Sequence, residues 1–91
     1  MTLQKRRAEW EKGCTVKAFL TKRFPSGYKV HYAILRRDFN EICVSEFQVI
    51  RYFDLNPGVD GGNWEASVDL PWVNDINDVF EYLNRQFEEP A

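Results

Sequence analysis

The chain has 91 residues, a formal net charge of −2 at pH 7, and a composition that is 44% hydrophobic and 15% aromatic. This length supports one hydrophobic core rather than two, and disordered chains are poor in apolar and aromatic side chains. No segment approaches the run of about 18 apolar residues that crosses a bilayer. The basic start, MTLQKRRAEWEKG, is not followed by the apolar stretch of a secretory signal. We therefore expect one small domain over residues 1–91, without a membrane span.

The two cysteines, Cys14 and Cys43, are too few for a disulfide framework, and neither belongs to a Cys-x-x-Cys pair. Both have apolar neighbours in the sequence, and free cysteine is among the most frequently buried residue types. We therefore expect two buried free thiols in a reducing, cytoplasmic environment.

The first expected element is an N-terminal helix within residues 1–13. Thr2 suits its N-cap, and Gly13 suits the left-handed position that follows a helix. Its apolar content is thin, so Leu3 and Trp10 would be its anchors to the rest of the chain.

Residues 14–73 predict a four-stranded antiparallel sheet. The segments CTVKAFLTKRF and YKVHYAILRR both alternate with a period of two and are separated by the turn PSG, which predicts a hairpin. One face of the first strand would carry Cys14, Val16, Ala18 and Leu20.

The third segment, EICVSEFQVIRYF, alternates less cleanly. Ile42 falls on one face and Phe47 on the other, so the pattern slips near Ser45 and Glu46. A β-bulge at that point would explain the slip, and so would an interior strand that is buried on both faces. The β-branched and aromatic content favours a strand over a helix.

The fourth segment, WEASVDLPW, follows the loop at 54–63 and alternates regularly. Pro71 cannot donate a hydrogen bond to a neighbouring strand, so this is expected to be an edge strand. Its apolar face would carry Trp64, Ala66, Val68, Leu70 and Trp72.

The segment NDINDVFEYLNRQFEE predicts a C-terminal amphipathic helix over residues 74–89, capped by Asn74 or Asp75. Its apolar stripe consists of Ile76, Val79, Phe80, Leu83 and Phe87. Burial of five such side chains contributes about 7–15 kcal/mol before entropy is subtracted, so the helix should pack on one face of the sheet. The expected partners on the sheet are Val16, Val30, Tyr32, Ala66 and Val68. The predicted fold class is α+β: a four-stranded antiparallel β-meander in the order α-β-β-β-β-α.

Charge is distributed unevenly along the chain. Up to Arg37 there are ten basic and two acidic residues, whereas from Asp38 onward there are two basic and twelve acidic residues. The two parts therefore carry net charges of +8 and −10, and this asymmetry is the most informative feature of the sequence.

Three interpretations of the asymmetry stay open. In the first, the two parts neutralise each other within the fold, where opposite charges on neighbouring strands contribute about 0.2–1 kcal/mol each. In the second, the sheet face opposite the C-terminal helix binds a nucleic-acid strand, with cations for phosphates and rings for bases. The residues predicted to form this binding surface are Lys17, Phe19, Arg23, Lys29, His31, Leu35 and Arg37.

In the third interpretation, the same face binds a protein partner or a second copy of the chain. It would be too apolar to remain in water, because Phe19, Leu35, Phe47 and Val49 are expected there. In a two-fold dimer, the basic part of one chain could then face the acidic part of the other.

No constellation in the sequence is typical of a catalytic site. His31 is the only histidine, and it has neither a second metal ligand nor a nucleophile at a suitable spacing. Gly61 and Gly62 precede a strand, whereas a phosphate-binding loop leads into a helix. We therefore expect no enzymatic activity, no cofactor and no small-molecule substrate.

The stretch DLNPGVDGGNWE resembles a twelve-residue calcium loop in its spacing. The residues at the ligand positions are Asp54, Asn56, Gly58, Asp60 and Glu65. However, Val59 occupies the sixth place, where a calcium loop requires glycine, and strands rather than helices flank the segment. We predict a hairpin connection over residues 54–63 and no metal site.

These observations predict a small cytoplasmic protein that acts by binding. The leading hypothesis is a protein-interaction or regulatory module that self-associates through the face opposite the C-terminal helix. The alternative is a nucleic-acid-binding protein that uses the first hairpin and the basic first helix. From size alone we also expect an accessory protein of the kind that phages and other mobile elements carry.

Overall fold

A computed structural model describes residues 1–88 of the chain, and the last residue of the predicted helix, Glu89, lies outside this range. Six elements follow one another: α1 (Leu3–Trp10), β1 (Thr15–Arg23), β2 (Lys29–Phe39), β3 (Val44–Asp54), β4 (Trp64–Val73) and α2 (Ile76–Glu88). The strands form one sheet in the order β1-β2-β3-β4, and all neighbours are antiparallel. The predicted α-β-β-β-β-α meander is therefore confirmed.

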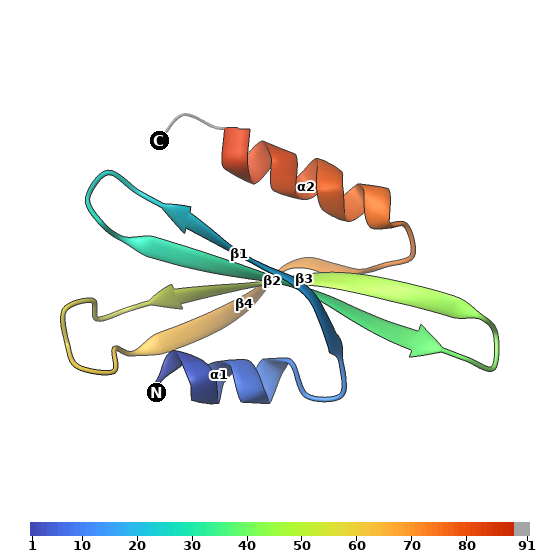
Figure 1. The fold of residues 1–91 in the computed structure, drawn as a ribbon, viewed down its shortest axis with the longest axis horizontal. Coiled ribbons are helices and arrows are strands. Elements are labelled where there is room, and N and C mark those ends of the chain that lie inside the picture. Colours follow the sequence, from blue (N-terminus) through green and yellow to red (C-terminus); the bar gives the residue numbers. More distant parts are fainter. Residues whose placement is uncertain (89–91) are drawn as a thin grey trace.

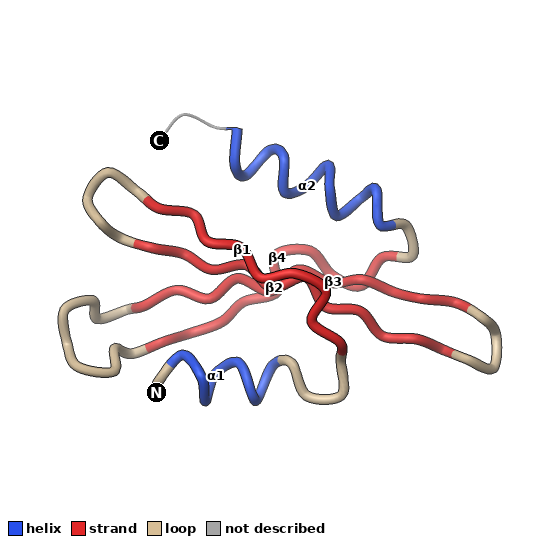
Figure 2. Tube along the Cα trace, viewed as in Figure 1, coloured by secondary structure: helices blue, strands red, loops and turns tan. Residues whose placement is uncertain are grey.

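The two helices lie on opposite faces of the sheet, as Figure 1 shows. Figure 2 shows the strands as a layer between α2 and α1. Under α2, an apolar cluster includes Tyr32, Val49 and Val79. Under α1, a second cluster includes Leu35 and Tyr52. The interior strands β2 and β3 are therefore buried on both faces.

The expectation of an open sheet face opposite α2 is wrong, because α1 covers it. Leu3 and Trp10 pack against the second cluster, and Leu35 is 0% exposed. Phe47 and Val49, which were expected on this face, pack under α2 instead. Because α1 has so few apolar residues, apolar packing alone would hold it only weakly on the sheet. Polar contacts provide the remaining attachment.

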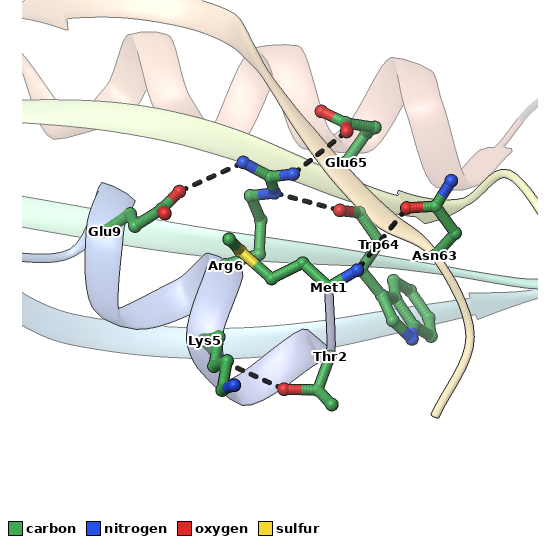
Figure 3. Close-up of polar contacts among 8 residues, drawn as sticks. All are labelled: Met1, Thr2, Lys5, Arg6, Glu9, Asn63, Trp64 and Glu65. Carbon is green, nitrogen blue, oxygen red and sulfur yellow. Dashed lines mark hydrogen bonds and ion pairs between the residues drawn. The ribbon is translucent and has the colours of Figure 1, made fainter. Parts of the chain in front are cut away.

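Figure 3 shows how polar contacts attach α1 to the edge strand β4. Arg6 Nε donates to the main-chain oxygen of Trp64 at 2.9 Å, and Arg6 Nη2 contacts Glu65 Oε1 at 2.9 Å. The main-chain N–H of Trp64 donates to the oxygen of Met1 at 2.9 Å. Thr2 caps the helix by accepting from the N–H of Lys5, as its N-cap position predicts. The start of the chain is thus tied to the start of β4.

A β-bulge in β1 changes which residues share a face. Val16 pairs with Leu35, whereas Ala18 pairs with Ile34, so Lys17 is the extra residue. The bulge places Val16 on the α1 side and Ala18 on the α2 side. The prediction that these residues share one face is therefore wrong.

The pairing of β2 with β3 is continuous from Val30 and Phe53 to Phe39 and Val44. The bulge proposed near Ser45 and Glu46 is therefore absent, and the interior-strand explanation is correct. Ile42, which is 68% exposed, lies in the turn before β3 rather than in the strand. Its position in the turn accounts for the slip in the sequence pattern.

The strand β4 is at the edge of the sheet, as Pro71 predicts, but its alternation is interrupted. Val49 pairs with Leu70 and Ile50 with Val68, so Asp69 is an extra residue and Leu70 turns to the α2 side. Of the partners expected for α2, only Val30 and Tyr32 belong to its cluster. The other three lie elsewhere: Ala66 packs on the α1 side, and Val16 and Val68 are 37% and 44% exposed.

The two cysteines are free, but their environments differ from the expectation. Cys14 is partly buried and packs against the α1-side cluster. Cys43 is exposed in the β2–β3 turn with a φ of 52°, so the prediction that it is buried is wrong. Within residues 1–88, neither helix is long and apolar enough to cross a membrane.

Candidate protein interface

The helix α1 divides the predicted binding surface into separate parts. Phe19 and Leu35 lie beneath α1 in its apolar cluster. Arg37 lies toward one end of the sheet, where its guanidinium stacks 3.9 Å from the Trp72 ring centroid and contacts Glu46 Oε1 at 2.8 Å. Lys17 is exposed on the β1 bulge. The structure therefore does not bring these four residues into one continuous exposed surface.

The remaining three predicted residues do come together. Arg23, Lys29 and His31 line one pocket at the end of the sheet that carries the β1–β2 turn. The binding role of all seven residues stays a prediction.

Several ion pairs join the basic and acidic parts of the chain. Arg6 contacts Glu65 at 2.9 Å, and Arg37 contacts Glu46 at 2.8 Å. Within residues 1–88, six cationic side chains form no ion pair: Lys5, Lys12, Lys17, Lys22, Arg23 and Lys29. Internal neutralisation therefore accounts for part of the charge asymmetry, and the unpaired cations lie in and just after α1, in β1 and at the start of β2.

An apolar groove of about 380 Å³ lies between α2 and the edge strand β1. Its strand side is formed by Ala18, Leu20 and Ile34. Its helix side includes Phe80 and Phe87, which are 51% and 41% exposed. Two large rings therefore remain accessible to water beside an apolar hollow.

The groove exists because the sheet covers Phe80 and Phe87 only in part, although the Phe87 ring centroid lies 5.5 Å from that of Tyr32. Val79 and Leu83 are 0% and 7% exposed, so they form the buried centre of the stripe. Phe80 and Phe87 lie on the flank of the helix that faces β1, and the expectation that they are fully buried is wrong. The width of the apolar stripe indicates this exposure. Five large residues at these spacings form a stripe that is wider than a single line of contact with the sheet.

A polar contact joins α2 to β4, at the other edge of the sheet from β1. The hydroxyl of Tyr82 donates to the carboxylate of Asp69, the extra residue of the β4 bulge. Burial, together with the Asp69 carboxylate, raises the pKa of Tyr82, so this hydroxyl stays protonated and donates. Arg51 Nε lies 3.4 Å from the same carboxylate. Tyr82 thus joins α2 to β4, while on the other flank Lys22 Nζ of β1 donates to the main-chain oxygen of Gln86 at 2.6 Å.

The charged residues of β1 and α2 lie outside the lining of the groove, which is apolar apart from Asn84. The strand β1 contains Lys17, Lys22 and Arg23 and no acidic residue. On α2, Asp78, Glu81 and Arg85 line the other flank of the helix, beside Leu70 of β4, and Glu81 pairs with Arg85 there. The groove therefore offers apolar contact to a partner, and the charges of α2 lie away from it.

The groove also borders a free sheet edge. The outer edge of β1 has no neighbouring strand in the sheet. Edge strands present main-chain N–H and C=O groups that another chain can use, and bulges limit such pairing. The bulge at Lys17 therefore leaves the part of β1 from Ala18 onward as the regular portion of the edge.

Within residues 1–88, no three or more His, Cys, Asp or Glu side chains come together in a group that could hold a metal ion. In the 54–63 connection, Asp54 Oδ1 instead accepts the main-chain N–H groups of Asn56 and Asn63 at 2.9 and 2.8 Å. This carboxylate therefore organises the loop backbone.

Comparisons with protein-family models, with curated proteins and with solved structures each found no match.

Proposed function

We propose that this protein is a non-enzymatic interaction module that self-associates through the groove between α2 and β1. This surface replaces the face opposite α2, which α1 covers. The observation that carries the proposal is the exposure of Phe80 and Phe87, 51% and 41%, beside an apolar hollow. Contiguous exposed apolar surface of this kind marks interaction sites in soluble proteins.

A second copy of the chain is the partner that this surface fits best. Each copy has projecting rings on α2 and an apolar strand side on β1. A two-fold axis would place α2 of one copy against β1 of the other, and the reverse, so that both grooves are filled.

The proposed location is the cytoplasm. Cys43 is a free thiol on the surface. Exposed free thiols suit a reducing compartment, because they form disulfides in an oxidising one.

Sedimentation of the purified chain at micromolar concentrations tests the proposal. The wild type should sediment as a dimer, and Phe80→Glu should sediment as a monomer, because a carboxylate in an apolar interface loses its hydration. Ile42→Glu is the matched control, since Ile42 is also an exposed apolar residue, at 68%, but lies in the β2–β3 turn. A wild type that remains monomeric up to submillimolar concentration, or a Phe80→Glu variant that dimerises normally, contradicts the proposal.

A further inference from the structure

A second pocket lies at the end of the sheet where the β1–β2 turn and the β3–β4 connection both project, at the left of Figure 1. Its volume is about 280 Å³, and its lining includes Arg23, Lys29, His31, Asp54 and Trp64. This volume is near the lower end of small-ligand sites, which begin at about 300 Å³. The pocket is separate from the α2–β1 groove and shares no lining residue with it.

Two cations face each other at the mouth of this pocket. Arg23 and Lys29 are direct cross-strand partners in the β1–β2 ladder, and both are exposed. Neither forms an ion pair with any other residue in 1–88. Like charges placed directly opposite each other destabilise a sheet. A bound anion would remove this repulsion, so the pair is suited to a phosphate group.

Aromatic rings form one wall of the pocket. The Trp64 ring centroid lies 5.3 Å from that of His31, and the His31 ring stacks on Phe19 with centroids 5.1 Å apart. Thr21 Oγ1 lies 2.8 Å from His31 Nδ1, which fixes the orientation of the imidazole ring. Flat rings of this kind stack with nucleobases.

The imidazole of this wall is uncharged at neutral pH. Burial lowers the pKa of His31, and the charges of Lys29, Arg23 and Arg7 lower it further. The positive charge of the pocket thus belongs to the two cations at its mouth, while the wall presents neutral rings.

The carboxylate of Asp54, which also lines the pocket, forms no ion pair with either cation. Its Oδ1 atom accepts two main-chain N–H groups of the connecting loop, at 2.9 and 2.8 Å. The hydroxyl of Tyr28, also in the lining, donates to the main-chain oxygen of Asp54 at 3.0 Å. These contacts join the β1–β2 turn to the β3–β4 connection, and the pocket lies between these two segments.

We propose that this pocket binds a nucleotide unit, with its phosphate at Arg23 and Lys29 and its unpaired base against the His31 and Trp64 rings. The unit has the same chemistry in a free mononucleotide and in a single strand of nucleic acid. An acidic peptide would satisfy the cations but would leave the aromatic wall without a stacking partner, so the nucleotide is favoured.

Fluorescence anisotropy of a labelled single-stranded oligothymidylate tests this proposal. One phosphate neutralised by the two cations predicts a slope of about −0.7 for the logarithm of the binding constant against the logarithm of salt concentration. Unlabelled thymidine monophosphate and inorganic phosphate are the competitors. They distinguish a site for the free mononucleotide from a site for the single strand. Competition by the mononucleotide, but not by phosphate, indicates a site that accepts the free unit. Oligonucleotide binding without such competition indicates a site for the strand.

Charge reversals locate the site. Arg23→Glu and Lys29→Glu should each weaken oligonucleotide binding at least about tenfold at low salt, because each replaces a phosphate contact with repulsion. Lys12→Glu is the control, since it makes the same change in net charge at an exposed residue outside the pocket. Trp64→Leu should weaken binding at least about fivefold through lost stacking, and Trp64→Phe should retain most of it.

Three results would each overturn the proposal. The first is no binding of either nucleotide probe in low salt, and the second is an equal loss of affinity in Lys12→Glu and Arg23→Glu. The third is binding of a polyglutamate peptide as tightly as the oligonucleotide, which would show that the cations alone determine binding. The same titrations in the Phe80→Glu background keep the outcome independent of self-association.

Discussion

The hydroxyl of Tyr52, in the middle of the sheet, donates a 2.7 Å hydrogen bond to Glu11 Oε2 at the C-terminal end of α1. Arg7 contacts the same carboxylate oxygen at 2.7 Å, so the Glu11 side chain joins the helix to the sheet. Burial and the Glu11 carboxylate both raise the pKa of Tyr52, which keeps this hydroxyl protonated. The hydrogen bond between Tyr52 and Glu11 thus helps to hold α1 on the sheet, whereas the apolar stripe of α2 holds that helix.

We expect Tyr52→Phe to lower the free energy of unfolding by about 1.5–3 kcal/mol, because a hydrogen bond to a charged group is lost from a covered site. Urea denaturation followed by circular dichroism measures this change. Tyr28→Phe is the control, since it removes a hydroxyl that donates to a neutral main-chain oxygen and should cost about 1 kcal/mol. Equal losses in the two variants would show that Glu11 contributes no special anchoring of α1.

The connection between β3 and β4 predicts unequal effects of two glycine substitutions. Gly62 has a φ of +66°, and an added Cβ would lie 2.6 Å from Asp54 Oδ2 and 2.8 Å from Trp64 Nε1. Gly58 has a φ of +92°, but an added Cβ there would meet no atom within 4 Å. Gly58→Ala should therefore cost about 1–2 kcal/mol of backbone strain, and Gly62→Ala should cost measurably more.

Thermal unfolding of these two variants checks this difference. In Gly62→Ala the Trp64 fluorescence should also change, because the new methyl group displaces either the indole or the Asp54 carboxylate. Indistinguishable stabilities would mean that the loop relaxes around the added group, which contradicts the close packing described here.

His31 should make stability depend on pH between about 7 and 5. Its pKa in the folded chain is lowered by burial and by Lys29, Arg23 and Arg7. The folded state therefore prefers the neutral ring, and the resulting stabilisation is complete above the unfolded pKa of about 6.5. It is lost as the pH falls below 6.5 toward the lower folded pKa.

Urea denaturation at a series of pH values measures this effect. Since His31 is the only histidine, His31→Gln should remove most of the pH dependence between 7 and 5. A wild type that becomes more stable on acidification in this interval would mean that the folded chain prefers the imidazolium, contrary to the prediction.

The two sides of the α2 stripe should separate stability from association. Leu83, which is 7% exposed, belongs to the core, so Leu83→Ala should lower the free energy of unfolding by about 2–5 kcal/mol. Phe80 is 51% exposed, so Phe80→Ala should change it by less than about 1 kcal/mol at low protein concentration. Denaturation at two protein concentrations distinguishes the effects. A large loss of monomer stability in Phe80→Ala would assign this ring to the core instead of the interface.

The elements and their order could be predicted because most of them have a strong local pattern. The period of two in β1 and β2, the proline in β4 and the apolar stripe of α2 all depend on near neighbours in the chain. Ion pairs between the two parts of the chain, such as Arg6 with Glu65, agree with one of the three interpretations of the charge asymmetry.

The face assignments could not be predicted, because they depend on bulges and long-range contacts. The sequence alternates without interruption around Lys17 and Asp69, yet each is an extra residue that moves the following side chain to the other face. The position of α1 depends on Arg6 and Glu11, which contact residues more than forty positions away. Such contacts leave no periodic signal, so the surface beneath α1 was expected to be open.

The central claim is that two copies of the chain associate through the α2–β1 groove. The most direct measurement is an isotope-filtered nuclear Overhauser experiment on a mixture of labelled and unlabelled chains. The account predicts contacts between the rings of Phe80 and Phe87 in one copy and the methyl groups of Ala18 and Leu20 in the other. Intermolecular contacts that map to α1, or none in a sample that sediments as a dimer, would contradict it.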